Sequence, residues 1–266
     1  MQLLLHPKTV KELALLDTTG AFVVHGPAGV GKTTAVLERL VPHRPQVIVP
    51  EPTAIKLAAV RELSSHFHLK GRVSERRIIV IDRADTMTVA AQNALLKTLE
   101  EVPAQAQIVL IADELGRLLP TIRSRCHQIY FQAPTSDQVA AWLAEQEHGL
   151  NSEEIALFAR NLPARVTNLL ADPEVLAATK RRYELIEKLF STNHYEALRS
   201  ARILQPETIE VLEDCIAYAR QQLRLQSGRY WEDAIQSCRY AQDLLSVNAN
   251  KRYILDAIAL SLRPAW

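Results

Sequence analysis

Hydrophobic positions in the first half of the chain follow two alternating patterns. Short apolar runs typical of buried strands are separated by longer stretches in which apolar residues recur at helical spacing. The strand-like runs are a segment that begins at Phe22 and residues 46–49, 78–81, 108–111 and 128–131. Because strands that alternate with helices form parallel sheets, the pattern predicts an α/β fold with a parallel sheet.

The segment between the runs at 78–81 and 108–111 shows a helical pattern. In residues 88–103, "TVAAQNALLKTLEEVP", strong helix formers dominate and Pro103 ends the pattern. The expected apolar stripe consists of Val89, Ala90, Ala94, Leu95 and Leu99. A helix is therefore predicted here.

Beyond the last strand-like run the pattern becomes helical. Thr135 or Ser136 is expected to begin one helix and Asn151 another, and Asp172 before a proline marks a further break. Later stripes at helical spacing include Leu185 and Leu189, and Ile254, Ile258 and Leu262. The pattern predicts an α/β domain over 1–132, a small helical domain over 133–173 and an all-α domain over 174–266.

The composition is that of an ordinary soluble protein. The 266 residues exceed the usual size of one domain, and 48% of them are hydrophobic and 23% charged. The formal net charge is +1, so no strong global field attracts nucleic acid, and the basic cluster at 180–182 fits either a solvated helix face or a DNA contact. No apolar run approaches the roughly 20 residues of a membrane span, and the first residues lack the order of a signal peptide. We therefore expect a cytoplasmic protein without a membrane partner.

Cysteine usage agrees with that compartment. Cys126, Cys215 and Cys238 are scattered and form no C-x-x-C pair, so neither a disulfide framework nor a cysteine zinc site is expected. Cys126 has no recognisable base partner, so we expect a small buried packing residue rather than a nucleophile.

The strongest local signal follows the first strand. The segment "GPAGVGKTT" fits the pattern G-x-x-x-x-G-K-[ST] at every fixed position and precedes a helical pattern. Glycines here let the backbone curl so that its N–H groups face phosphate oxygens, while Lys32 bridges the outer phosphates and Thr33 reaches Mg²⁺. The candidate nucleotide-binding residues are Gly26, Pro27, Ala28, Gly29, Val30, Gly31, Lys32, Thr33 and Thr34. The alternative is a plain glycine turn before a helix.

Asp82 ends the run "IIVID" and is a further candidate for the same site. Because parallel strands bring their carboxyl ends to one edge, Asp82 is expected beside Thr33 as a partner of magnesium. A strand-terminal turn aspartate is the alternative interpretation. Arg83 follows where many ATP-hydrolysing proteins carry a second acid that activates water. The chain is therefore expected to bind ATP or ADP with Mg²⁺ and to hydrolyse ATP poorly by itself.

The succession of "GPAGVGKT", "VIDRADTMTVAAQNALLKTLEEVP" and "TIRSRC" resembles the AAA+ clamp loaders, most of all the delta-prime subunits of the bacterial DNA polymerase III clamp loader. Residues 244–262 are similar to the last helical segment by which such subunits join a collar. The resemblance implies an AAA+ P-loop core, a lid over 133–173 and an oligomerising collar over 174–266. It implies other clamp-loader subunits of a hetero-oligomer, a sliding clamp and primed DNA as partners.

The resemblance also gives roles to single residues. Arg125 matches the arginine finger that reaches a neighbouring subunit's ATP site, which makes it the candidate catalytic residue, acting in trans. The alternative is a structural arginine that holds the start of a strand at the protein surface. Arg165 matches the sensor 2 arginine that touches the nucleotide, and a plain helix-surface arginine is its alternative. Asp113 lies near the sensor 1 position, where an acid would repel phosphate.

Departures from the family affect the expected activity. The zinc module of many bacterial relatives is missing, because residues 42–77 are few and contain no cysteine, so no zinc is expected. Arg83 and Asp113 are expected to impair hydrolysis, which depends on positioning and electrostatics. The preferred function is a clamp-loader subunit that helps ATP-driven partners to load the sliding clamp. Two alternatives stay open: an autonomous AAA+ remodelling ATPase, in branch migration or helicase loading, and a P-loop kinase for a small molecule.

Overall fold

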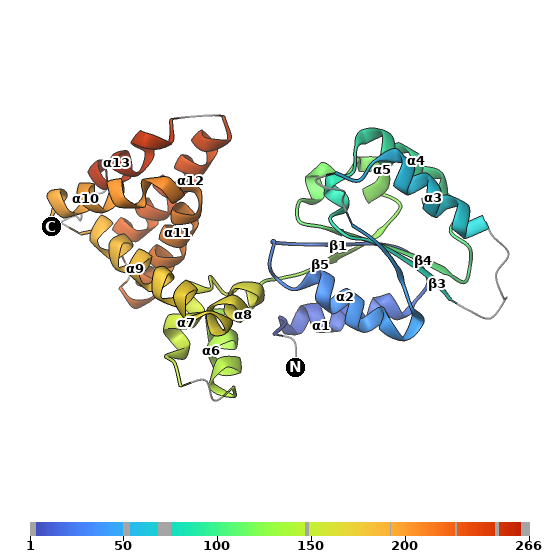
Figure 1. Cartoon of the computed structure of the whole chain (residues 1–266), viewed down its shortest axis with the longest axis horizontal. Helices are drawn as coiled ribbons and strands as arrows, with labels where there is room; N and C mark the ends of the chain where they lie inside the picture. The colour runs from blue at the N-terminus through green and yellow to red at the C-terminus, as the bar shows by residue number, and fades with distance from the viewer. Residues whose placement is uncertain are drawn as a thin grey trace. The chain divides into compact units, whose positions relative to one another are not determined.

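Parallel pairing joins the strands of the N-terminal part of the chain. The computed structural model describes residues 4–49, 54–68, 76–146, 149–191, 193–226, 228–247 and 250–261, and five strands in these ranges form one sheet. They are β1 (Gly20–His25), β2 (Gln46–Ile48), β3 (Arg77–Ile81), β4 (Ala106–Ala112) and β5 (His127–Tyr130). Their order is β2-β3-β4-β1-β5, and each neighbouring pair is parallel (Figure 1). The predicted α/β fold with a parallel sheet is confirmed.

Alternate residues of the strands face two layers of helices (Figure 1). Ile79 and Ile81 of β3 belong to a core with α3, α4 and α5, whereas Ile78 and Val80 belong to a second core with α1 and α2. This burial on both faces explains why the strands are continuous apolar runs. The helices are α1 (Pro7–Leu13), α2 (Lys32–Leu40), α3 (Leu57–His68), α4 (Val89–Glu100) and α5 (Pro120–Arg123), with the short 3-10 helices η1 (Ala14–Asp17), η2 (Val41–His43), η3 (Ala84–Thr86) and η4 (Leu115–Arg117).

Helix α4 confirms the predicted helix and corrects its buried face. The Thr88 hydroxyl caps it by accepting the N–H of Ala91 at 3.2 Å. The fully buried apolar positions are Ala91, Leu95 and Leu99, while Val89 is 63% exposed. Val89 and Ala90, which is also exposed, were therefore wrongly expected in the apolar stripe, because the first turn of α4 turns both side chains to solvent.

Every element that the structure describes after β5 is helical. The expected helix starts are confirmed, since Thr135 accepts the N–H of Gln138 at 3.3 Å and the side chains of Asn151 and Asp172 likewise accept N–H groups of their first turns. The helices are α6 (Ser136–Ala144), α7 (Ser152–Phe158), α8 (Pro163–Ala171), α9 (Pro173–Leu189), α10 (His194–Leu204), η5 (Gln205–Glu207), α11 (Thr208–Leu225), α12 (Arg229–Ser246) and α13 (Lys251–Ser261). Within the predicted collar segment 244–262, residues 248–249 and Leu262 lie outside the described residues.

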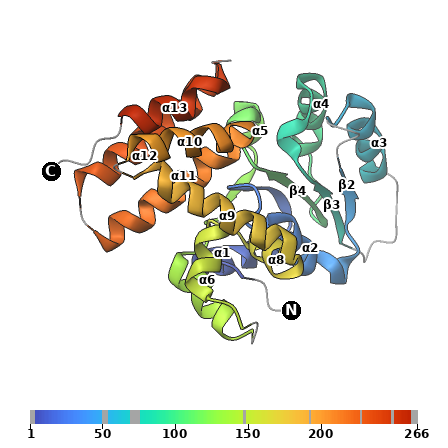
Figure 2. The same ribbon diagram turned by 60° about the vertical axis from the view of Figure 1, so that its left-hand side comes forward.

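The chain divides into two compact units. The first comprises Met1–Gln138 with Leu162–Ala164, and the second comprises Val139–Asn161 with Arg165–Trp266. In the second unit, α9 to α13 lie side by side (Figure 2) around an apolar core that includes Ile186, Leu212 and Ile254. The predicted domain boundaries at 132 and 173 stay predictions. None of the described helices has the length and apolar character that crossing a bilayer requires.

Candidate nucleotide-binding site

The glycine-rich loop between β1 and α2 requires glycine at its first position. Gly26 has φ of 148°, and a Cβ there would lie 2.3 Å from the carbonyl oxygen of Phe131. This close approach is held by a hydrogen bond in which the N–H of Phe131 donates to the His25 carbonyl at 2.7 Å. Burial and the charge of Lys32 lower the pKa of His25, so its ring stays neutral at pH 7 beside the loop.

Two glycines of the loop adopt left-handed conformations before α2 begins. Gly29 and Gly31 have φ of 76° and 90°, which favours glycine at both places. Gly31 is the N-cap of α2, and no side chain caps this end. The N–H groups of the first turn are therefore not used by a capping side chain, which suits an anion at the end of the helix dipole.

Lys32 is almost completely buried, with 5% of its side chain exposed. Its ammonium donates to the carbonyl oxygens of Gly26 at 2.7 Å and Pro27 at 2.8 Å, and to the Asp113 carboxylate at 2.6 Å. An ammonium group has three N–H donors, so these acceptors match its full capacity. The pairing of Lys32 with Asp113 was not foreseen from the sequence, which only indicated an acid near the phosphate.

Thr33 and Asp82 meet at the carboxyl edge of the sheet. The Thr33 hydroxyl donates to a carboxylate oxygen of Asp82 at 2.8 Å, and the same oxygen accepts the N–H of Arg83 at 3.0 Å. Arg83 has a left-handed φ of 50°. Because its proton points at Asp82, the Thr33 hydroxyl keeps its lone pairs for a cation, as the predicted magnesium role requires.

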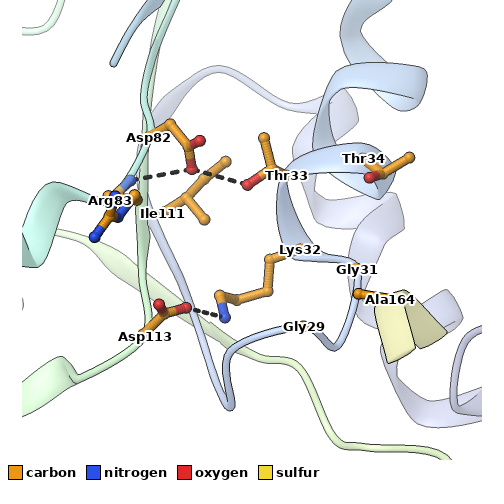
Figure 3. Close-up of a pocket in the computed structure, with 10 residues that line it drawn as sticks. All are labelled: Gly29, Gly31, Lys32, Thr33, Thr34, Asp82, Arg83, Ile111, Asp113 and Ala164. Atoms are coloured by element: carbon orange, nitrogen blue, oxygen red, sulfur yellow. Dashed lines mark hydrogen bonds and ion pairs between the residues drawn. The ribbon is translucent and has the colours of Figure 1, made fainter. Parts of the chain in front are cut away.

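A pocket brings most of the predicted residues together (Figure 3). Figure 3 shows Lys32 reaching Asp113 at the end of β4, and Thr33 reaching Asp82 at the end of β3. The lining residues are Gly29, Gly31, Lys32, Thr33, Thr34, Asp82, Arg83, Ile111, Asp113 and Ala164. Among the remaining loop residues, Ala28 is exposed and Val30 is buried in the core with α1 and α2.

The residues of this pocket fit a nucleotide with Mg²⁺. The glycine conformations open the loop backbone, the uncapped helix end offers N–H groups, and Lys32 supplies a buried positive charge. Thr33 and Asp82 place a hydroxyl and a carboxylate next to each other, and such hard oxygen donors suit Mg²⁺. The arrangement can therefore hold phosphates and their counter-ion.

Asp85 is a site residue that the sequence reasoning missed. One of its carboxylate oxygens accepts the N–H groups of Asp113 at 3.2 Å and Glu114 at 3.1 Å. Asp85 thereby fixes the loop after β4 and aims Asp113 at Lys32. The available signal was a second acid, three residues after Asp82, in the segment that follows β3.

Arg125 lies at the other edge of the sheet. It lies two residues before the start of β5, whereas the pocket follows the last residues of β1, β3 and β4. Its side chain is 37% exposed, and its Nε donates to the Glu100 carboxylate at 2.9 Å. Neighbouring Cys126 is buried, as predicted, and burial raises the pKa of its thiol to about 12.

Arg165 lies in the second unit among acidic side chains. Its guanidinium is 3.3 Å from the carboxylate of Asp214 and 3.6 Å from that of Glu210. Only 17% of the Arg165 side chain is exposed. The structure thus gives Arg165 carboxylate partners within its own unit, and its contact with a nucleotide stays a prediction.

The fold and the pocket define an α/β protein with a P-loop, and comparisons with known proteins show which families the chain resembles. The family described as "DNA polymerase III, delta subunit" matches residues 37–135. The chain is 31% identical to the DNA polymerase III subunit delta' of Bacillus subtilis (strain 168) over 143 residues, which are 54% of this chain and 44% of that protein. It is 39% identical to the subunit delta' of Escherichia coli (strain K12) over 88 residues, 33% of this chain and 26% of that protein.

Further matches include a eukaryotic protein and a solved structure. Replication factor C subunit 3 of Schizosaccharomyces pombe is 32% identical over 116 residues, 41% of this chain and 34% of that protein. A crystal structure of a DNA polymerase III, gamma subunit-related protein from Thermotoga maritima aligns over 97% of this chain and 99% of its own, with 18% identity and a TM-score of 0.48.

The family match and the delta' relatives show that this chain is similar to delta' subunits of DNA polymerase III. The matched segments span less than half the length of these curated relatives.

Proposed function

We propose that this chain is a subunit of a DNA polymerase III clamp loader that binds ATP or ADP with Mg²⁺ and hydrolyses ATP poorly by itself. ATP-driven partner subunits of the same hetero-oligomer would open a sliding clamp and place it on primed DNA in the cytoplasm. The observation that carries the proposal is the phosphate-binding geometry of Lys32, Thr33 and Asp82 in a chain whose relatives are named delta' subunits.

Each pocket residue has a role in binding. The loop glycines let backbone N–H groups approach the phosphates, and Lys32 balances the charge of the outer phosphates. Thr33 holds the cation with its lone pairs, and Asp82 orients the Thr33 hydroxyl by accepting its proton at 2.8 Å. Bound Mg²⁺ neutralises charge on the phosphates.

Poor hydrolysis follows from the residue after Asp82. Water must be oriented and relieved of a proton for efficient hydrolysis, and a carboxylate serves this purpose. Arg83, which lines the pocket, carries a guanidinium, which offers N–H donors and no acceptor for the proton of a water. Asp113 is a carboxylate, but its Lys32 partner at 2.6 Å engages it. Binding without brisk turnover is therefore the activity that these side chains support.

The place of Arg125 supports a role in trans. An arginine at the amino-terminal edge of the sheet is on the opposite side from the pocket of its own unit, so the natural target of its exposed part is another subunit. A guanidinium supplied across an interface stabilises charge on the transferring phosphoryl group, worth about 10³ to 10⁵ in rate for the best-studied GTPases. We therefore propose Arg125 as an arginine finger for a neighbouring subunit.

The second candidate function is an autonomous AAA+ remodelling ATPase, in branch migration or helicase loading. The intact Lys32, Thr33 and Asp82 geometry favours it equally, whereas Arg83 argues against it. The ATPase rate of the isolated chain separates the two, because an autonomous motor turns over without clamp-loader partners.

The proposal is tested by nucleotide binding and by assembly. Lys32→Ala should abolish the binding of a fluorescent ADP or ATP derivative, whereas Lys97→Ala, which removes an exposed lysine on α4, should leave binding unchanged. The wild-type chain should co-purify with clamp-loader subunits, and the ATPase of that complex should rise with a sliding clamp and primed DNA. Unchanged affinity of Lys32→Ala, or a chain that joins no clamp-loader complex, would contradict the proposal.

A further inference from the structure

Asp113 forms an ion pair with Lys32, whose positive charge the outer phosphates of a nucleotide would need. Lys32 is 5% exposed and Asp113 41% exposed, so the carboxylate forms the solvent side of the pair. The other two donors of Lys32 are held by the carbonyl oxygens of Gly26 and Pro27 in the loop itself. Asp113 is thus the charged partner of Lys32, and it lies just after the end of β4 (Figure 3).

Asp113 is held in this position by more than its attraction to Lys32. It follows the last residue of β4, and the pairing of Ala112 with His25 brings it level with Gly26 at the start of the loop. Asp85 accepts its N–H at 3.2 Å and that of the next residue at 3.1 Å. The carboxylate therefore stays near the Lys32 ammonium when another anion approaches.

We propose that Asp113 makes this pocket selective for a nucleoside diphosphate over the corresponding triphosphate. The proposal rests on the nucleotide binding proposed above. In a P-loop the backbone N–H groups hold the inner phosphates while the lysine reaches the outer ones, so the terminal phosphate of a triphosphate lies beside the lysine and beyond the loop. Here that place faces the Asp113 carboxylate, and like charges at short range repel.

A diphosphate avoids most of this repulsion. Its two phosphates would bind to the loop and to the uncapped N-terminus of α2, and it carries no third phosphate that has to lie beside Asp113. Lys32 can then turn a donor that now binds the Gly26 or Pro27 carbonyl toward the outer phosphate and keep its ion pair with Asp113. The third phosphate of ATP has to displace the carboxylate from Lys32 or accept its charge nearby, and both cost affinity.

The test compares two nucleotides on two matched variants. Dissociation constants of ADP and ATP at saturating Mg²⁺ are measured by calorimetry for the wild-type chain, Asp113→Asn and Glu114→Gln. Both changes turn a carboxylate into an amide of the same shape. Glu114 pairs with Arg117 at 2.7 Å instead of Lys32, so its variant controls for the lost charge in this loop. Thermal unfolding of each variant verifies the fold.

We expect the wild-type chain and Glu114→Gln to bind ADP more tightly than ATP. Asp113→Asn should tighten ATP binding by about tenfold more than ADP binding, a difference of about 1.4 kcal/mol. Equal affinities of the wild-type chain for ADP and ATP, or a preference for ADP that Asp113→Asn leaves unchanged, would overturn the inference while nucleotide binding stands. If neither nucleotide binds to the wild-type chain or to Asp113→Asn, the proposed nucleotide binding itself fails.

Discussion

A guanidinium nitrogen of Arg165 lies 3.3 Å from the carboxylate of Asp214, whose side chain is fully buried. Arg160 and Arg182 approach the same carboxylate, each with its Nε at 3.5 Å. Burial raises the pKa of Asp214, and the three guanidinium groups oppose that shift. This cluster joins four helices of the second unit. Arg160 follows α7, and the other members lie in α8 (Arg165), α9 (Arg182) and α11 (Asp214).

The first prediction concerns the stability that Asp214 gives to these helices. Asp214→Asn leaves three largely buried guanidinium groups without their shared counter-charge, so we expect it to lower the free energy of unfolding by about 3 kcal/mol. Asp233→Asn, at an exposed position of α12, should change it by less than about 0.5 kcal/mol. Urea unfolding followed by circular dichroism measures the free energy of unfolding of both variants. Equal values for the two variants would show that the arginine cluster does not need the charge of Asp214.

The same cluster provides a test of the nucleotide contact expected of Arg165. Arg160→Ala and Arg165→Ala each remove one guanidinium from the side of Asp214, so both should destabilise the chain similarly. If Arg165 also touches the nucleotide, as we predict, only Arg165→Ala should weaken ADP binding, by about tenfold. Equal ADP affinities of the two variants would leave Arg165 with its structural role alone.

Arg125 should matter to a neighbouring subunit and not to its own pocket. We expect Arg125→Ala to leave nucleotide affinity and unfolding of the isolated chain unchanged, because its ion pair with Glu100 is largely exposed and such pairs contribute little. In a reconstituted complex the variant should lower the ATPase rate. The largest loss that we expect is the fraction of the total rate that comes from the ATP sites that Arg125 completes.

Two variants control this experiment. Arg117→Ala breaks a comparable exposed pair with Glu114 and should leave the ATPase of the complex unchanged. Glu100→Gln keeps Arg125 but removes its counter-charge, so the ATPase should not fall. Loss of nucleotide binding by the isolated Arg125→Ala chain would show that the role in trans is wrong.

The features that could be predicted have local signals in the sequence, whereas the features that were missed depend on contacts between residues far apart along the chain. The strands and the loop from Gly26 to Thr33 were predictable, because their signals are local apolar runs and the fixed spacing of one motif. The pairing of Lys32 with Asp113 depends on the register between β1 and β4, which no local pattern reveals. Arg165 and Asp214 meet through the packing of α8 and α11, so a single-residue match to a family motif did not disclose this partner.

Gly26 should be the least replaceable glycine of the loop. In Gly26→Ala the new Cβ would lie 2.3 Å from the backbone carbonyl of Phe131, at a φ that side chains rarely adopt. Since a backbone atom cannot move aside cheaply, we expect a loss of about 3 kcal/mol in the free energy of unfolding. Gly116→Ala meets nothing within 4 Å and should change stability by less than about 0.5 kcal/mol. Similar urea midpoints for both variants would contradict the close approach of β5 to the loop.

Arg83→Glu restores a carboxylate after Asp82, and we expect it to leave hydrolysis slow. The backbone N–H of residue 83 still binds Asp82 at 3.0 Å, but Asp113 keeps its place on Lys32 and no arginine from a second subunit reaches the pocket of an isolated chain. A turnover rate well below the common range of about 1 to 10³ per second is expected for this variant. Arg44→Glu introduces the same residue at another exposed arginine with a left-handed φ, 49° against 50°, and controls for charge and backbone strain. Brisk single-turnover hydrolysis by isolated Arg83→Glu would show that the missing acid alone limits the reaction and that Asp113 does not.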